Sequence, residues 1–251
     1  MSNGVCLIIP VRLKSERFPD KALALYNGRT LLQSSIIIAK RLDFVDKIVV
    51  AMADDDDRLK DICNKNNIEY VISYKKASCG TERAYFASKT KECKGFLYYI
   101  TLPVDEPSIK AYELNKVWKK KKNHSSDKIY TMYSDFFCEE DVLDERSCKI
   151  VSKGKKVLYT SRAVIPSSKN GIMHHISVFK RHVAVFVFPS AMLQKYGEKI
   201  WSHDNNATWE SLEQNSMIPF DLTLCKIEHD GFGIDTPDQI KLLEERMNKW
   251  K

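Results

Sequence analysis

Four cations lie within ten residues of one another in the loop that follows the first apolar run of the chain, residues 5–9. They are Arg12, Lys14, Arg17 and Lys21. Arginine offers forked donors and lysine a mobile point charge, so this composition suits a polyphosphate ligand. A solvated basic surface loop would have the same composition. The sequence contains neither GxGxxG nor GxxxxGK[ST], which leaves a dinucleotide-binding or P-loop motif without support.

Two aspartates follow predicted strands that lie far apart in the sequence. Asp105 comes just after the apolar run 96–101, and Asp235 follows the run 222–228. Parallel strands bring their carboxyl ends to one edge of a sheet, so both carboxylates can point at the same place. Such a pair suits Mg²⁺, which prefers oxygen ligands and keeps several waters beside phosphate. The alternative role for each aspartate is to cap the helix that follows it.

The elements that position these side chains alternate between strand and helix in the first half of the chain. We predict strands at residues 5–9, 47–52, 69–73, 96–101 and 128–134, and helices from Thr30, after the acidic cluster 54–57, at 81–93 and at 107–122. This alternation predicts βαβ units, and right-handed crossovers place helices on both faces of the sheet. We therefore expect an α/β fold with a mostly parallel, Rossmann-like sheet.

The second half of the chain changes character. Residues 148–151 and 155–161 flank Ser152-Lys153-Gly154, which predicts a hairpin. We predict further strands at 183–188 and 222–228 and helices at 192–199, 209–214 and 237–248. No repeat or linker divides the sequence, so we expect a single domain over residues 1–251, in which residues 150–215 contribute a small lobe.

Composition limits the class of protein. The chain has 251 residues, 43% of them apolar and 29% charged, which is typical of a soluble globular domain. Its net charge of +7 suits an anionic ligand. The seven dispersed cysteines are typical of reduced thiols in the cytoplasm. Residues 1–10 have the pattern of neither a signal peptide nor a membrane span, so we expect a cytoplasmic protein without a membrane partner.

Several segments, in order along the chain, resemble the CMP-sugar synthetases. The basic loop matches their opening PAR-x-x-S-x-R-L-P-x-K at Arg12, Ser15, Arg17, Pro19 and Lys21. Residues 79–83 (CGTER) are similar to SGTER, 105–107 (DEP) to the end of QGDEP, and 159–166 (YTSRAVIP) to YFSRATIP. Residues 181–182 (RH) open a segment similar to RHLGIYGYR, 210–214 (ESLEQ) are similar to ExLEQ, and 235–238 (DTPD) to DTPED. Within the family, the resemblance is to the 3-deoxy-manno-octulosonate (Kdo) cytidylyltransferases.

The resemblance implies a cytidylyltransferase of nucleotide-sugar biosynthesis for lipopolysaccharide or capsule. The anomeric hydroxyl of Kdo or a related acidic sugar would attack the α-phosphorus of CTP, and pyrophosphate would leave. Such chemistry depends on positioning and on neutralising charge on phosphate oxygens. Arg12 and Lys21 would be the catalytic cations, and Asp105 and Asp235 would bind the cofactor Mg²⁺. The family also implies a homodimer built through the second-half lobe.

The resemblance also implies two ligand sites. The nucleotide would contact Arg12, Ser15, Arg17, Lys21, Gly80, Thr81 and Arg83. The last three lie at a predicted helix start, where free N–H groups favour an anion, although ordinary capping with a first-turn salt bridge is the alternative. The sugar would contact Arg162, His182, Glu210, Glu213 and Gln214. For the last three residues, a surface face of a helix is the alternative.

Some positions depart from the family pattern, and all of them lie near the implied pockets. Pro103-Val104 replaces Gln-Gly, Asp20 replaces a Gly, Phe186 a Tyr, Ser216 an Arg and Ser167 a Trp. These changes leave open a nucleotidyltransferase for a different sugar or phosphonate acceptor, and a catalytically silent nucleotide-binding homologue. A nucleic-acid-binding module would rest on the net charge and the lysine run 119–122. That run lacks the interleaved aromatic residues of single-strand binders, so we expect no nucleic-acid partner.

Overall fold

The computed structural model describes residues 4–73, 77–121, 127–170, 173–200 and 210–249. The strands of its large sheet are β1 Val5–Val11, β4 Lys47–Met52, β5 Glu69–Ile72, β6 Tyr98–Thr101, β7 Ile129–Asp135, β8 Lys149–Lys153, β9 Lys156–Ser161, β10 Lys180–Pro189 and β11 Leu222–Lys226. The helices are α1 Leu31–Lys40, α2 Asp57–Lys65, α3 Gly80–Ser88, α4 Ala111–Lys121, α5 Glu139–Leu143, α6 Ser190–Ile200 and α7 Asp238–Asn248. Shorter elements are η1 Lys21–Leu23, β2 Leu25–Tyr26, β3 Arg29–Thr30, η2 Ile176–Val178 and η4 Glu213–Phe220.

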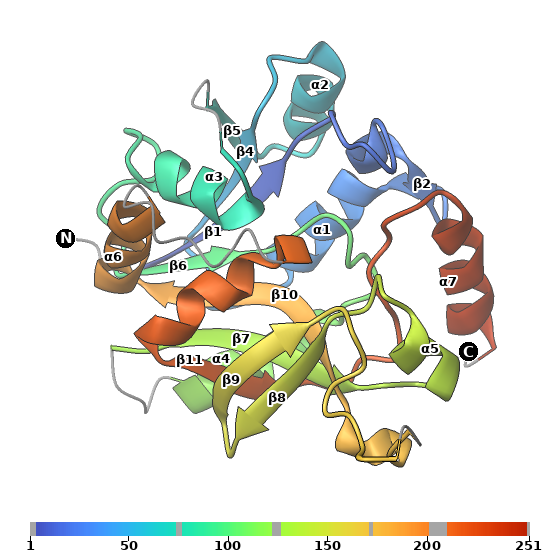
Figure 1. Cartoon of the computed structure of the whole chain (residues 1–251). Helices are drawn as coiled ribbons and strands as arrows, with labels where there is room; N and C mark the ends of the chain where they lie inside the picture. Colours follow the sequence, from blue (N-terminus) through green and yellow to red (C-terminus); the bar gives the residue numbers. More distant parts are fainter. Residues whose placement is uncertain (1–3, 74–76, 122–126, 171–172, 201–209, 250–251) are drawn as a thin grey trace.

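The large sheet has the strand order β5-β4-β1-β6-β10-β7-β11-β9-β8, which can be followed in Figure 1. The strands β5, β4, β1 and β6 are all parallel. β10 runs antiparallel between β6 and β7, whereas β7 and β11 are parallel to each other. The expected parallel sheet therefore holds for the first half of the chain, and the second half is mixed. A parallel strand needs a long crossover, usually helical, whereas a tight hairpin joins β8 and β9 and makes them antiparallel.

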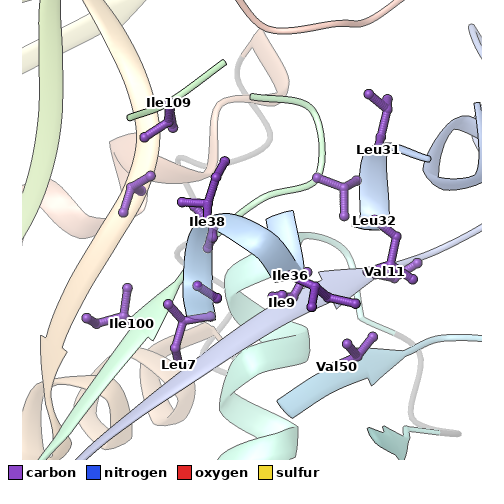
Figure 2. Packing of buried hydrophobic residues seen from close by; sticks show 14 of the residues in the cluster. Leu7, Ile9, Val11, Leu31, Leu32, Ile36, Ile38, Val50, Ile100 and Ile109 are labelled. Carbon is purple, nitrogen blue, oxygen red and sulfur yellow. The ribbon is translucent and has the colours of Figure 1, made fainter. Parts of the chain in front are cut away.

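The sheet is covered on both faces, which explains the continuous apolar run of β1. Successive side chains of a strand point to opposite faces. Leu7, Ile9 and Val11 pack in one core with residues of α1, α2, α4 and α7, as Figure 2 shows for α1. Cys6 and Ile8 pack in the second core with residues of α3 and α6. Both faces of β1 are therefore buried, as its composition predicts.

Helix α1 begins at the position that we predicted, after a cap at Thr30. The Thr30 hydroxyl accepts from the Gln33 amide at 3.1 Å, and the Gln33 side chain accepts from the Thr30 amide at 2.9 Å. This reciprocal capping box satisfies two amides that the helix itself cannot pair. The β8–β9 hairpin is also confirmed, with Gly154 in a left-handed conformation at φ 60°.

Other boundaries differ from the predicted ones. α4 begins at Ala111 rather than at Pro107, because the preceding segment buries Ile109 in the core and directs Glu106 into a buried ion pair. The predicted helix 209–214 begins outside the described residues, and η4 begins only at Glu213. The lysine run 119–122 ends α4 as far as Lys121 and then lies outside the described residues.

A short hairpin and a short helix are among the elements that were not predicted. The hairpin β2–β3 turns at Asn27-Gly28, where both residues have positive φ, 48° and 73°. An Asn-Gly pair is a strong hairpin signal in the sequence. The five-residue helix α5 carries three acidic residues in its first turn, where they complement the helix dipole. Among the helices that the structure describes, none has the length and apolar character needed to cross a membrane.

Candidate active site

The basic loop after β1 is anchored in the protein interior. Leu13 and Phe18, which flank its central cations, are 7% and 9% exposed and belong to the core beneath α1. The Asp20 amide donates to the Leu13 carbonyl oxygen at 3.0 Å, and the Leu13 amide donates to Asp54 Oδ2 at 3.3 Å. The loop is therefore fixed to the body of the protein and is not a freely solvated segment.

Lys21 joins the two aspartates that we singled out in the sequence. Its ammonium nitrogen donates to Asp105 Oδ2 at 3.0 Å, to Asp235 Oδ1 at 3.4 Å and to the Ile234 carbonyl oxygen at 2.9 Å. Arg17 forms a second ion pair with Asp235, at 3.1 Å between Nη2 and Oδ2. Because both carboxylates contact one nitrogen atom, they lie closer together than the roughly 8 Å limit for carboxylates that share an ion. β6 and β11 thus deliver their aspartates to one edge of the sheet, as predicted.

Burial and neighbouring charges shift the pKa of Lys21 in opposite directions. Burial of the ammonium group lowers the pKa of Lys21, but the charges of Asp105 and Asp235 outweigh it and raise the pKa above its ordinary value. Lys21 is therefore a cation at neutral pH. Neither aspartate caps a helix: α4 begins at Ala111, and the N-cap of α7 is Pro237. The alternative role as helix caps is therefore wrong for both.

The donors at this edge fit a divalent ion that arrives with phosphate. Within the part of the chain that the structure describes, no group of three His, Cys, Asp or Glu side chains is placed to hold a metal. Asp105 and Asp235 supply two carboxylates, and Mg²⁺ commonly binds through one or two carboxylates, substrate phosphates and waters. The residues present are therefore compatible with Mg²⁺ only as a partner of a phosphate ligand.

A second group of cations lies where β1 faces the start of α3. Arg83 is 5% exposed, and the described residues provide no hydrogen bond or ion pair to its guanidinium. Burial, followed by the like charge of Arg12, lowers the pKa of Arg83, and the charge of Asp54 opposes this shift. Two arginines that repel each other at the end of a strand would be stabilised by an anion between them.

The start of α3 combines capping with a link to the second half of the chain. The Cys79 sulfur accepts from the Glu82 amide at 3.4 Å, and Glu82 Oε2 accepts from the Ser78 hydroxyl at 2.7 Å. The capping alternative is thus confirmed for these residues, but the salt bridge proposed with it does not occur among the described residues. The Thr81 amide donates to Glu213 Oε2 at 3.0 Å. Glu213, expected to bind sugar, therefore reaches the predicted nucleotide segment.

The backbone accounts for the residue types at two positions near the loop. Asp20 has φ 56°, a left-handed conformation that the glycine of the family pattern adopts freely. Its carboxylate pairs with Arg58 of α2 at 2.9 Å. At Gly80, a Cβ atom would lie 3.3 Å from Pro10 Cγ, so the absence of a side chain lets α3 approach β1.

Arg162 and Glu210 contact each other at the end of β9. Glu210 has φ 57° and lies in a short 3-10 turn before η4. Its carboxylate accepts from the Ser161 hydroxyl at 2.8 Å, the Arg162 amide at 2.5 Å and the Tyr159 hydroxyl at 3.0 Å. The Arg162 guanidinium donates to the carbonyl oxygens of Glu210 and Glu145, at 2.9 and 3.2 Å. Its positive charge forms no salt bridge among the described residues.

The other two predicted sugar ligands are buried in contacts of their own. Gln214 is 4% exposed and donates from Nε2 to the Cys148 sulfur at 3.1 Å. His182 Nε2 lies 2.8 Å from the Thr131 hydroxyl, and its ring packs against Phe186. Burial lowers the pKa of His182 to about 4, so its imidazole is neutral at physiological pH. Because Gln214 is buried, the alternative of a surface helix face is wrong for this residue.

A buried ion network beneath the aspartates was not predicted from the sequence. Glu106 pairs with Arg181 and with His229, each at 3.0 Å. Burial raises the pKa of Glu106, but Arg181 and His229 outweigh it and lower the pKa to about 2. The sequence signal was the placement of Glu106 and Arg181 inside two family motifs, DEP and RH, whereas nothing marked His229.

Comparisons with known proteins support the resemblance. The sequence profile of the cytidylyltransferase family matches residues 6–223. The chain is 26% identical over 253 residues to the 3-deoxy-manno-octulosonate cytidylyltransferase of Protochlamydia amoebophila, which covers 99% of this chain and 96% of the relative. It is 30% identical over 192 residues to that of Wigglesworthia glossinidia brevipalpis, which covers 76% of this chain and 77% of the relative.

The fold is also that of known nucleotidyltransferase structures. It is similar to a CMP:2-keto-3-deoxy-manno-octonic acid synthetase complexed with CTP, with a TM-score of 0.81, 21% identity, and coverage of 98% of this chain and 99% of that one. It is less similar to a 4-diphosphocytidyl-2C-methyl-D-erythritol synthase from Anaerococcus prevotii, with a TM-score of 0.64, 14% identity and 98% coverage of both chains. The sequence profile spans most of the chain, and the chain belongs to the cytidylyltransferase family.

Proposed function

We propose that the protein transfers CMP from CTP to Kdo or a related acidic sugar and releases pyrophosphate. The observation that carries the proposal is the contact of Lys21 with both Asp105 and Asp235 at the carboxyl edge of the sheet. The names of its relatives, which are Kdo cytidylyltransferases, and the CTP bound to its structural neighbour support this choice of substrates.

The cations of the first half would hold the triphosphate. Arg12 and Arg83 repel each other, and a phosphate between them would remove that repulsion. Lys21 keeps its proton, because the aspartates raise its pKa, so its role would be to donate to phosphate oxygens rather than to act as a base. Arg17 and Ser15 belong to the same anchored loop. Together these groups would neutralise charge that builds on the departing pyrophosphate.

Asp105 and Asp235 would hold Mg²⁺ together with the phosphates. When bound, the ion supplies positive charge to the reacting phosphate oxygens and reverses the repulsion between triphosphate and aspartates. Lys21 and Arg17, which pair with these carboxylates in the structure, would then turn their donors toward the nucleotide.

The second half would bind the acidic sugar. Within the described parts of the chain, the Arg162 guanidinium donates to backbone carbonyl oxygens alone, which leaves its charge for a sugar carboxylate. Glu210 and Glu213 would bind hydroxyls, with Gln214 and His182 supporting the pocket wall from the interior. Residues 150–215 would form the sugar-binding lobe of a single nucleotidyltransferase domain and the contact of a homodimer. We place the reaction in the cytoplasm, in nucleotide-sugar synthesis for lipopolysaccharide or capsule.

One observation favours a second candidate, a nucleotidyltransferase for a different acceptor. Phe186 is fully buried and packs against His182, so the hydroxyl of the tyrosine in the family pattern is absent beside this predicted sugar ligand. A site that hydrogen-bonds a substrate group rejects acceptors without that group strongly, so the loss of this hydroxyl would change which acceptors the site accepts. A panel of acidic sugars and phosphonates would separate the two candidates.

The test is pyrophosphate release from each of CTP, UTP, ATP and GTP with Mg²⁺ and each acceptor. We expect release only with CTP and an acidic sugar, and a larger thermal stabilisation by CTP than by the other nucleotides. Equal stabilisation by all four would contradict the cytidine assignment. Stabilisation by CTP without turnover of any acceptor would support a catalytically silent homologue.

A further inference from the structure

Glu106 joins three separate segments in the interior of the protein. Its Oε1 accepts from Arg181 Nη1 and its Oε2 lies against His229 Nε2, each at 3.0 Å. All three side chains are buried. Arg181 belongs to β10, whereas His229 belongs to the loop between β11 and α7. Both oxygens of the carboxylate are thus used inside the protein, and Glu106 is not itself placed to bind substrate.

This network lies directly beneath the two aspartates. Glu106 follows Asp105 in sequence, and His229 is on the same loop as Asp235. The two loops also join through the backbone, since the Ile234 amide donates to the Asp105 carbonyl oxygen at 2.8 Å. A Cβ atom on Gly233 would lie 3.5 Å from Glu106 Oε1, so the second loop passes over the carboxylate. The contacts of Glu106 therefore fix one aspartate loop against the other.

The composition of the network indicates a purpose other than stability. Burying a carboxylate and a guanidinium is costly, and apolar residues of similar volume are often equally stable in such places. In addition, Arg181 Nη2 and His229 Nδ1 are buried and have no partner among the described residues. The ion network instead provides directional contacts, because the two oxygens of one side chain hold two segments at fixed positions.

We infer that Glu106 is a positioning residue that, through His229 and Arg181, holds Asp105 and Asp235 at the spacing that a shared divalent cation requires. The inference rests on the proposed function for the role of the two aspartates. Residues behind the direct ligands of a metal orient those ligands, and changing such residues commonly lowers metal affinity by about 10- to 100-fold. Glu106 would contribute in this way without contacting metal, nucleotide or sugar.

The test compares Glu106→Gln with a matched buried carboxylate. Glu113 is also buried and accepts from the Glu228 amide at 3.0 Å, so it anchors the same β11–α7 loop, but it pairs with Lys116 and not with Arg181. The readout is Mn²⁺ binding in the presence of CTP, followed by electron paramagnetic resonance. We expect Glu106→Gln to weaken Mn²⁺ binding about tenfold or more while CTP binding without metal stays unchanged, and Glu113→Gln to bind Mn²⁺ like the wild type.

A second variant tests the inference even if Glu106→Gln does not fold. His229→Phe removes the contact on the Asp235 side alone and should weaken Mn²⁺ binding less than Glu106→Gln. Wild-type Mn²⁺ affinity in a folded Glu106→Gln or His229→Phe protein overturns the inference, and so does an equal loss in Glu113→Gln. If wild-type protein binds Mn²⁺ with CTP but turns over no acceptor, the proposed function fails while the comparison of variants still tests the network.

Discussion

The cationic edge around Lys21 and the lobe around Glu210 are built in opposite ways. At the edge, Lys21, Asp105 and Asp235 come from three distant segments, and Arg12 adds an unfavourable charge beside Arg83. In the lobe, the Glu210 carboxylate is already satisfied by Ser161, Arg162 and Tyr159, which follow one another on and after β9. The fold thus leaves the like charges of Arg12 and Arg83 unbalanced at the edge, whereas in the lobe the carboxylate of Glu210 is satisfied by hydrogen bonds.

This difference indicates how each ligand would bind. An anion between Arg12 and Arg83 would relieve repulsion that the folded chain already contains, and Lys21 and Arg17 would exchange aspartate for phosphate as their partner. A sugar in the lobe would have to replace hydrogen bonds that Glu210 and Arg162 now make within the protein, and each exchange contributes only a small net free energy. We therefore expect large effects on turnover from changes at the edge and smaller effects on sugar affinity from changes in the lobe.

The largest effect should come from the aspartates. Asp105→Asn and Asp235→Asn should each lower kcat by about 10³-fold or more, because either change removes half of the carboxylate pair proposed to bind the ion. Their losses should not add in the double variant, since each single change already empties the site. CTP binding without metal should stay equal or become tighter. Additive losses, or near-normal turnover of either variant, would show that the two aspartates do not bind one shared ion.

Lys21→Ala should lower kcat/KM by roughly 10²-fold, or about 2.7 kcal/mol of transition-state stabilisation, and Arg12→Ala should behave similarly. Lys14→Ala is the matched control, because Lys14 is an exposed cation of the same loop outside the family pattern. Steady-state kinetics with CTP and the sugar would measure all three. Comparable losses in Lys14→Ala and Lys21→Ala would mean that the net charge of the loop matters rather than the contact of Lys21 with the aspartates.

In the lobe, Arg162→Lys should raise the KM for the sugar about tenfold and leave the KM for CTP unchanged, because lysine lacks the forked donors that bind a carboxylate. Tyr159→Phe, which removes one hydroxyl from Glu210 and keeps Arg162, is the control and should have little effect. An equal rise in the KM for CTP would remove the distinction between the nucleotide edge and the sugar lobe.

The smallest effect concerns stability. Burial lowers the pKa of His182 from 6.5 to about 4, so the unfolded chain takes up a proton first as the pH falls. Stability from this group is therefore full above pH 6.5 and is lost as the pH falls toward its folded value. We expect a loss of about 1 kcal/mol between about pH 7 and about pH 5.5 that His182→Gln abolishes. Urea unfolding measures it, with the exposed His175→Gln as control; the same slope in His182→Gln would show that another group is responsible.

The predictable parts of the molecule carry local signals. The apolar run of β1 and the capping box at Thr30 are readable because neighbouring residues determine them. The meeting of Asp105 and Asp235 could be predicted from a general property of parallel strands. The antiparallel direction of β10 could not, because it depends on how a long connection crosses the sheet. Nor could His229 be identified, since its partner Glu106 comes from a distant segment.

The central claim is that an acidic sugar attacks the α-phosphorus of CTP at the edge formed by Lys21, Asp105 and Asp235. Phosphorus-31 nuclear magnetic resonance of the reaction with CTP, Kdo and Mg²⁺ tests it most directly. The expected result is one CMP–sugar phosphodiester and one pyrophosphate for each CTP consumed, with neither product formed by Asp105→Asn. Formation of CDP and inorganic phosphate, or equal product formation by Asp105→Asn, would contradict the account.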